Sequence, residues 1–148
     1  MKYAYFPHLF EPICIGGTVL GNRIVMPPMS TNFADPGRPG EVSDRHLRYY
    51  AERAKGGAGL IIVESTSVNP KAAMRRYGLA LHGDAFLPGM RALVTEVTRH
   101  GAACGIQLIH GGRVGPMKTS GDGSYSGASS VPVYAASALP HPRTGIPT

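Results

Sequence analysis

The sequence lacks long apolar runs, and this absence argues against a membrane protein. No apolar run in its 148 residues approaches the length of about 18 residues that a membrane-spanning helix needs. The N-terminal stretch MKYAYFPHLFEPICIGG also has no uninterrupted apolar segment, so it is a poor candidate for a secretory signal. The composition, 43% hydrophobic and 16% charged, is that of a globular chain. We therefore expect a cytoplasmic protein with no membrane segment.

Cysteine is scarce: Cys14 and Cys104 are the only two, each in a strand-like stretch. Neither has a second thiol nearby and the histidines are dispersed, so the sequence predicts no metal site. Two buried, reduced thiols are the expected state, with a disulfide or a ligand pair as the alternative.

Acidic residues are outnumbered, with 9 Asp and Glu against 15 Lys and Arg, which gives a net charge of +6. This excess suits an anionic partner such as a nucleotide, a coenzyme or a nucleic acid. The basic residues are scattered, however, and Arg75-Arg76 is the only adjacent pair. Because no basic run is interleaved with aromatic residues, the pattern argues against nucleic-acid binding.

What the sequence does contain is an alternation of strand-like and helix-like segments. Residues 13–15 and 18–20 flank Gly16-Gly17 and predict a β-hairpin. Further strands are expected at residues 23–26, 59–64 and 106–110, and helices around residues 43–56 and 90–97. Ser43 is a candidate helix cap, and Gly56-Gly57 a helix stop. This alternation predicts a parallel sheet in an α/β fold, with the apolar run 59–64 covered on both faces.

The last segment, residues 111–148, differs in composition: 21 of its 38 residues are Gly, Pro, Ser or Thr. A loop of this length is either functional or disordered. A parallel sheet of three strands would leave both edges unpaired. A (β/α)₈ barrel takes roughly 250 residues, and a doubly wound sheet usually has five or six strands. We therefore expect a truncated domain, either a fragment or one half of a split protein.

Candidate site residues follow the predicted strands, because ligands of parallel α/β folds bind beyond the carboxyl ends of the strands. These ends are residues 27–32, 64–66 and 107–113, the polar or irregular points of otherwise apolar segments. Pro28-Met29-Ser30 offers an apolar surface for an aromatic ring and one hydroxyl, although it is also compatible with a plain strand exit.

Gln107 and the residues after it extend this site. An amide in a strand buried on both faces must find partners or costs roughly 1–3 kcal/mol. Its carboxamide matches the imide-like edge of a pyrimidine or flavin ring; bonding to neighbouring main chain is the alternative. His110 can donate to a ligand carbonyl or be structural, and Arg113 can pair with a carboxylate or phosphate. The glycines at 56–59 precede a strand, which excludes a Rossmann fingerprint, and Gly-Gly-Arg does not fit a phosphate-binding P-loop.

Three stretches, LFEPICIGGTVLGNRIVMPPMS, YYAERAKGGAGLIIVESTSV and GIQLIHGGRVG, resemble the N-terminal part of the old yellow enzyme family of NAD(P)H:flavin oxidoreductases. Within this family, the sequence around SDRHLRYYAERA is more similar to the branch that contains 2,4-dienoyl-CoA reductases and bacterial enoate reductases. The resemblance implies a (β/α)₈ TIM barrel that holds FMN at the strand ends, with an N-terminal hairpin over its bottom. Residues 1–148 would then be part of the FMN-binding domain, and 111–148 the long loop after the third barrel strand.

The resemblance also implies roles for the candidate residues. Pro27, Pro28 and Met29 would line the isoalloxazine ring, and Ser30 would lie near flavin N5, where many relatives have Thr or Cys. Ser65 would contact the flavin through its backbone, and Gln107 would bond the pyrimidine edge. Arg113 would have a structural role for the long loop, and His110 and Arg113 are kept as secondary or substrate-side candidates.

The activity that this resemblance implies is an ene reduction. NADH or NADPH reduces the flavin, and hydride passes from flavin N5 to an electron-poor alkene such as an enone, enoate or enoyl thioester. The substrate-binding His/Asn or His/His pair and the proton donor would lie beyond residue 148, as would any 4Fe-4S cluster or FAD. The partner would be the rest of the barrel, a complementary chain or a homo-oligomer. A non-catalytic scaffold half is the alternative from a different class of protein.

Overall fold

The computed structural model describes residues 5–114, 117–119, 125–128, 134–137 and 139. Its helices are α1 (Asp44–Lys55) and α2 (Leu87–Thr98), with short 3₁₀ turns at Pro7–Phe10, Pro70–Ala72, Asp84–Phe86 and Gly112–Val114. Its strands are β1 (Ile13–Ile15), β2 (Thr18–Leu20), β3 (Val25–Met26), β4 (Leu60–Ser67), β5 (Leu79–Ala80), β6 (Ala103–Ile109), β7 (Met117–Thr119) and β8 (Tyr125–Ala128). Neither helix in this part of the chain is long and apolar enough to cross a membrane.

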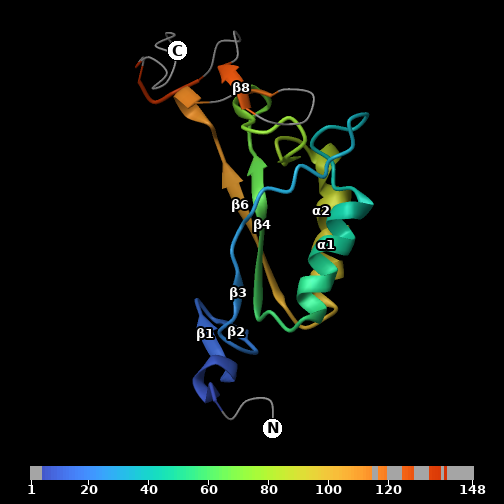
Figure 1. The fold of residues 1–148 in the computed structure, drawn as a ribbon, viewed down its shortest axis with the longest axis vertical. Helices are drawn as coiled ribbons and strands as arrows, with labels where there is room; N and C mark the ends of the chain where they lie inside the picture. The colour runs from blue at the N-terminus through green and yellow to red at the C-terminus, as the bar shows by residue number, and fades with distance from the viewer. Residues whose placement is uncertain (1–4, 115–116, 120–124, 129–133, 138, 140–148) are drawn as a thin grey trace.

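Strands β1 and β2 form the predicted hairpin, with Ile13 paired to Leu20. Gly16 and Gly17 make the turn with φ values of 55° and 86°, a conformation that most side chains disfavour. The hairpin lies at the end of the sheet where the parallel strands begin (Figure 1). The parallel strands finish at the opposite end of the sheet, away from the hairpin (Figure 1).

The main sheet is parallel and is built around β4. Strand β3 pairs with the start of β4, β5 pairs with its far end on the same side, and β6 runs along its other side. This confirms the predicted alternation of parallel strands and helices. Strand β5 was not predicted, because two residues are too few for a periodic pattern.

Both helices pack on one face of this sheet (Figure 1). Helix α1 follows Ser43 and ends at Gly56, and Gly57 then has a left-handed φ of 94°. The core includes the predicted helix positions Tyr50, Ala54, Met90, Leu93 and Val97, together with Met26, Ile61, Val63, Leu79 and Ala102. The helix predictions are therefore confirmed in position and in buried face, although α2 begins earlier than expected, at Leu87.

The other face of the sheet is less covered than the sequence suggested. We predicted β4 and the strand of Gln107 to be buried on both faces. In the structure Leu60 and Ile62 are only half-buried, and Gln107 is exposed. These expectations are wrong because α1 and α2 both lie on one side. The expectation of two buried thiols is also wrong for Cys14, which is exposed on the two-stranded hairpin, whereas Cys104 is half-buried; both are free.

Residues 111–148 were expected to form a long loop. Within this segment the structure describes a turn at Gly112–Val114 and a small antiparallel hairpin in which Met117 pairs with Ala128. The segment thus has some regular structure of its own, and most of its remaining residues lie outside the described part.

Candidate functional site

The segment after β3 leaves the sheet and then returns to it. Pairing with β4 ends at Met26 and Ile61, directly before two prolines that have no N–H to continue it. A few residues later Asn32 adopts a left-handed φ of 55°, which Asn tolerates better than most residues. The chain therefore bends just where it meets β4 again.

Two of the predicted site segments touch at this return. The hydroxyl oxygens of Ser30 and Ser65 are 3.0 Å apart, within hydrogen-bond distance. In the next residue, the backbone N–H of Thr31 donates to the carboxylate of Glu64. The structure thus brings the segment after β3 against β4, as predicted from the strand order, although β4 continues to Ser67 and Glu64 and Ser65 lie within the strand and not beyond its end.

The third segment meets them at an irregularity in the sheet. Val63 pairs with Ile106 and Thr66 with Leu108, so two residues of β4, Glu64 and Ser65, lie opposite the single residue Gln107. This is a β-bulge, a feature that re-aims side chains and is common beside active sites. Because Ile106 packs against the helix-side core, alternation places Gln107 on the opposite face, where its side chain is exposed.

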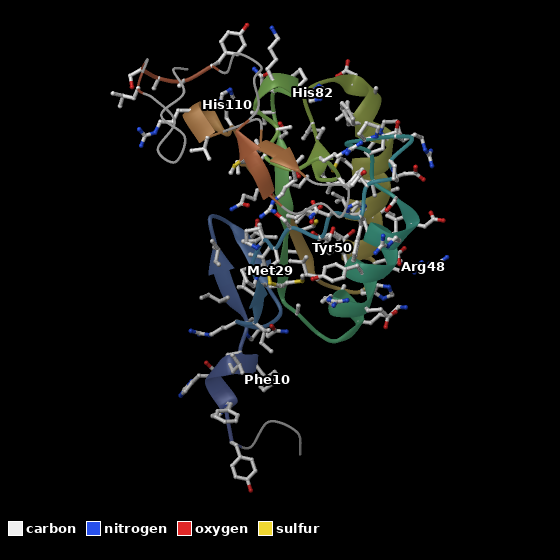
Figure 2. All side chains as sticks on the ribbon, turned by 45° about the horizontal axis from the view of Figure 1, so that its top comes forward. Phe10, Met29, Arg48, Tyr50, His82 and His110 are labelled. Atoms are coloured by element: carbon white, nitrogen blue, oxygen red, sulfur yellow. The ribbon has the colours of Figure 1, made fainter. Side chains whose placement is uncertain are left out.

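Helix α1 holds this bulge through two buried side chains. The backbone N–H of Glu64 donates to the hydroxyl of Tyr50 at 2.9 Å, and His46 Nε2 lies 3.2 Å from Glu64 Oε1. His46, Tyr50 and Glu64 are all 0% exposed. Burial raises the pKa of the Tyr50 hydroxyl, which therefore stays protonated. Tyr50 lies between α1 and the strands (Figure 2).

The hydrogen bonds of His46 assign its tautomer. The backbone N–H of Ser43 donates to His46 Nδ1 at 3.1 Å, so this nitrogen must be the acceptor. The proton is then on Nε2, from which it is donated to Glu64. The Ser43 hydroxyl donates to the carbonyl of Phe33 at 2.7 Å, and its oxygen also lies 3.0 Å from His46 Nδ1. The buried Glu64 carboxylate accordingly accepts two hydrogen bonds, one from His46 and one from Thr31.

Sequence reasoning missed this network. It treated Tyr50 as an apolar core position and gave no role to His46 or to Glu64. Two signals were present: a carboxylate in an apolar strand, and a His–Tyr pair four residues apart, which places both side chains on one helix face.

The other predicted residues lie around the bulge without joining the network. Pro27 and Met29 are exposed and Pro28 is half-buried. His110 follows β6 (Figure 2), and its Nδ1 accepts the N–H of Gly112 at 3.1 Å, which favours a structural role in its loop. Arg113 is exposed and makes no ion pair with other described residues. In the described part of the chain, no three His, Cys, Asp or Glu side chains are grouped to bind a metal ion.

Known proteins resemble this chain over most of its length. The model of the NADH:flavin oxidoreductase / NADH oxidase family matches residues 8–143. An NADH oxidase of Thermoanaerobacter brockii is 43% identical over 110 residues, which are 74% of this chain and 17% of that protein. An NADPH dehydrogenase of Geobacillus thermodenitrificans is 39% identical over 136 residues, 92% of this chain and 38% of that protein.

The fold is matched as well. The old yellow enzyme of Trypanosoma cruzi superposes with a TM-score of 0.72 at 31% identity, over 98% of this chain and 41% of that one. This likeness confirms the predicted fold class, an N-terminal portion of a (β/α)₈ barrel. The chain spans less than two fifths of the length of the two relatives described above.

Proposed function

The chain belongs to the NADH:flavin oxidoreductase / NADH oxidase family, and from this premise we propose that the edge around Ser30, Ser65 and Gln107 is the flavin-ring part of an FMN site. The complete protein would be an NAD(P)H-dependent oxidoreductase of the ene-reductase type. The observation that carries the proposal is the convergence of these three segments at the bulge of β4.

The groups at this edge fit an isoalloxazine ring. The Gln107 carboxamide is exposed and makes no hydrogen bond to other described residues, so its donor and acceptor remain available to the ring's imide edge. Thr31 Oγ1 is buried and has no hydrogen-bond partner among the described residues. Met29, 49% exposed, provides an adaptable apolar surface beside Pro27 and Pro28.

Within this site the chain's residues would bind and orient the ring. FMN, when bound, supplies hydride transfer between NAD(P)H and an electron-poor alkene. The two hydroxyls of Ser30 and Ser65 share one hydrogen bond, which leaves the second hydroxyl proton free to be donated to the ring. Gln107 would fix the pyrimidine end, so that the ring could not slide along the strand ends.

The finer parts of the proposal concern substrate and further cofactors. An enone, enoate or enoyl thioester is the proposed substrate, and no residue of this chain is assigned to its protonation. The resemblance to the 2,4-dienoyl-CoA reductase branch extends the proposal to a 4Fe-4S cluster and FAD in the complete protein. A cysteine cluster elsewhere in the complete protein would support that extension, and its absence would refute it.

Replacing Gln107 by Leu in the complete protein tests the FMN site. We expect FMN binding to weaken by about 1–3 kcal/mol, because the buried polar edge of the ring loses its partner. Titration of the apoprotein with FMN, followed by flavin fluorescence, measures this change. Thr18→Val, a polar-to-apolar change on the distant β2, is the matched control and should leave the affinity unaltered.

Two results would contradict the proposal in different ways. An unchanged FMN affinity in Gln107→Leu would mean that this amide does not contact the ring. A complete wild-type protein that binds no FMN would overturn the proposed function itself.

A further inference from the structure

The bulge in β4 needs support that the sheet does not give. A bulge leaves a residue without its ladder partner, and an unpaired N–H in a core is costly. Here the N–H of Glu64 is taken up by Tyr50, whose side chain is fully buried in the apolar cluster. A Phe would fill the same space, so the hydroxyl of Tyr50 has one evident use, which is to hold the bulge.

His46, one turn earlier on α1, supports the same bulge through the side chain of Glu64. Its Nε2–H binds one oxygen of Glu64, and the other oxygen of Glu64 accepts the N–H of Thr31. The side chain of Glu64 therefore connects helix α1 to the segment that follows β3. Its backbone and its carboxylate are both fixed by residues of α1.

The neighbours of the anchored residues are the proposed flavin contacts. Ser65 follows Glu64 and Ser30 precedes Thr31, and their hydroxyls are 3.0 Å apart. A shift of Glu64 would therefore move both hydroxyls at once. His46 and Tyr50 are 0% exposed within the helix-side core and act one residue away from the open site.

We propose that His46 and Tyr50 are a positioning pair, through which helix α1 sets the bulge of β4 and hence the placement of Ser30 and Ser65 against the flavin ring. The pair's role rests on the proposed FMN site. Neither residue is catalytic, because both act through Glu64.

Tyr50→Phe in the complete, FMN-loaded protein is the first test. It removes the hydroxyl and keeps the packing, so the protein should still fold. Tyr49→Phe is the matched control, since Tyr49 is the neighbouring residue of α1 and its hydroxyl makes no hydrogen bond within the described part of the chain. We expect Tyr50→Phe to raise the FMN dissociation constant roughly two- to tenfold. It should also shift the flavin reduction potential measured at saturating FMN, and Tyr49→Phe should do neither.

His46 provides the second test. His46→Gln keeps an acceptor for Ser43 N–H and a donor for Glu64, as a Gln does in a capping box. It should retain the wild-type potential and affinity, whereas His46→Leu, which has neither group, should change both in the same direction as Tyr50→Phe. If the pair were merely structural, Tyr50→Phe and His46→Leu would lower the midpoint of the unfolding transition but would leave the flavin reduction potential of the folded, flavin-saturated protein unchanged.

The outcomes separate the two proposals. If the wild type binds FMN and Tyr50→Phe changes neither affinity nor potential, the positioning pair is refuted and the FMN site stands. The pair is refuted in the same way if His46→Gln is altered as strongly as His46→Leu. If the wild type binds no FMN, the proposed function fails and the pair's role fails with it.

Discussion

Replacing Glu64 by Gln should destabilise the protein, although the two side chains have nearly the same shape. Glu64 accepts two hydrogen bonds, from Thr31 N–H and from His46 Nε2–H. Gln offers one oxygen and one NH₂ group, so one of these donors would face another donor. His46 cannot relieve the conflict by moving its proton to Nδ1, because the N–H of Ser43 already points at that atom.

The expected magnitude follows from one buried hydrogen bond lost and one donor left unpaired. Such a change costs about 1–3 kcal/mol of the free energy of unfolding. Part of it is offset, since an amide is cheaper to bury than a carboxylate. Urea unfolding, followed by circular dichroism, measures the difference. Glu52→Gln makes the same substitution on the exposed side of α1 and should change the midpoint little.

A second substitution tests the reasoning further. In the double variant Glu64→Gln/His46→Glu, the carboxylate introduced on α1 can accept from Ser43 N–H and from the amide introduced on β4, so a good part of the lost stability should return. Coupled residues of one network typically show such non-additivity. A single Glu64→Gln variant as stable as the wild type would refute the assignment of two accepted bonds. A double variant no better than the single one would refute the assignment of the His46 tautomer.

Two further predictions concern the base of the sheet and the thiol of Cys104. In Gly59→Ala the new Cβ would lie 2.5 Å from the backbone oxygen of Asn22, so urea unfolding should show a loss of about 1–3 kcal/mol. Gly21→Ala, with open space around it, should not show this loss, and equal effects would contradict the steric reason. Burial raises the pKa of the Cys104 thiol, so its contribution to stability should be present below about pH 8.5, where the unfolded thiol ionises, and be lost as the pH rises through the folded pKa. The fall in urea midpoint between pH 7 and 10 should be smaller in Cys104→Ala, and an equal fall would contradict this origin.

Features set by local sequence were predicted well. The hairpin at Gly16-Gly17 and the two helices depend on turn residues and on apolar spacing within one segment. The meeting of the three strand ends also followed, because parallel strands finish at one edge of a sheet. The contact between Ser30 and Ser65 confirms that meeting, whereas the roles of these residues toward FMN stay predictions.

Features set by distant residues were not predicted. The bulge at Glu64 depends on how β4 pairs with β6, and its support comes from His46 on a helix 18 residues earlier. The exposure of Gln107 depends on which face the helices cover, and an apolar run does not reveal this. Burial alone made Tyr50 look like a packing residue, since its hydroxyl matters only beside the freed N–H of Glu64.

The extra residue in β4 also changes the phase of the strand. Before it, the odd-numbered residues Ile61 and Val63 are the buried ones, whereas from the bulge onward Glu64, Thr66 and Ser67 are buried and Ser65 is half-buried. A sequence read in one phase along the whole strand would therefore place Glu64 and Thr66 on the exposed face. Deleting a single residue here would reverse the orientation of the side chains that follow it in β4. A graft of this strand into another barrel must therefore include both the bulge and helix α1, which supports it.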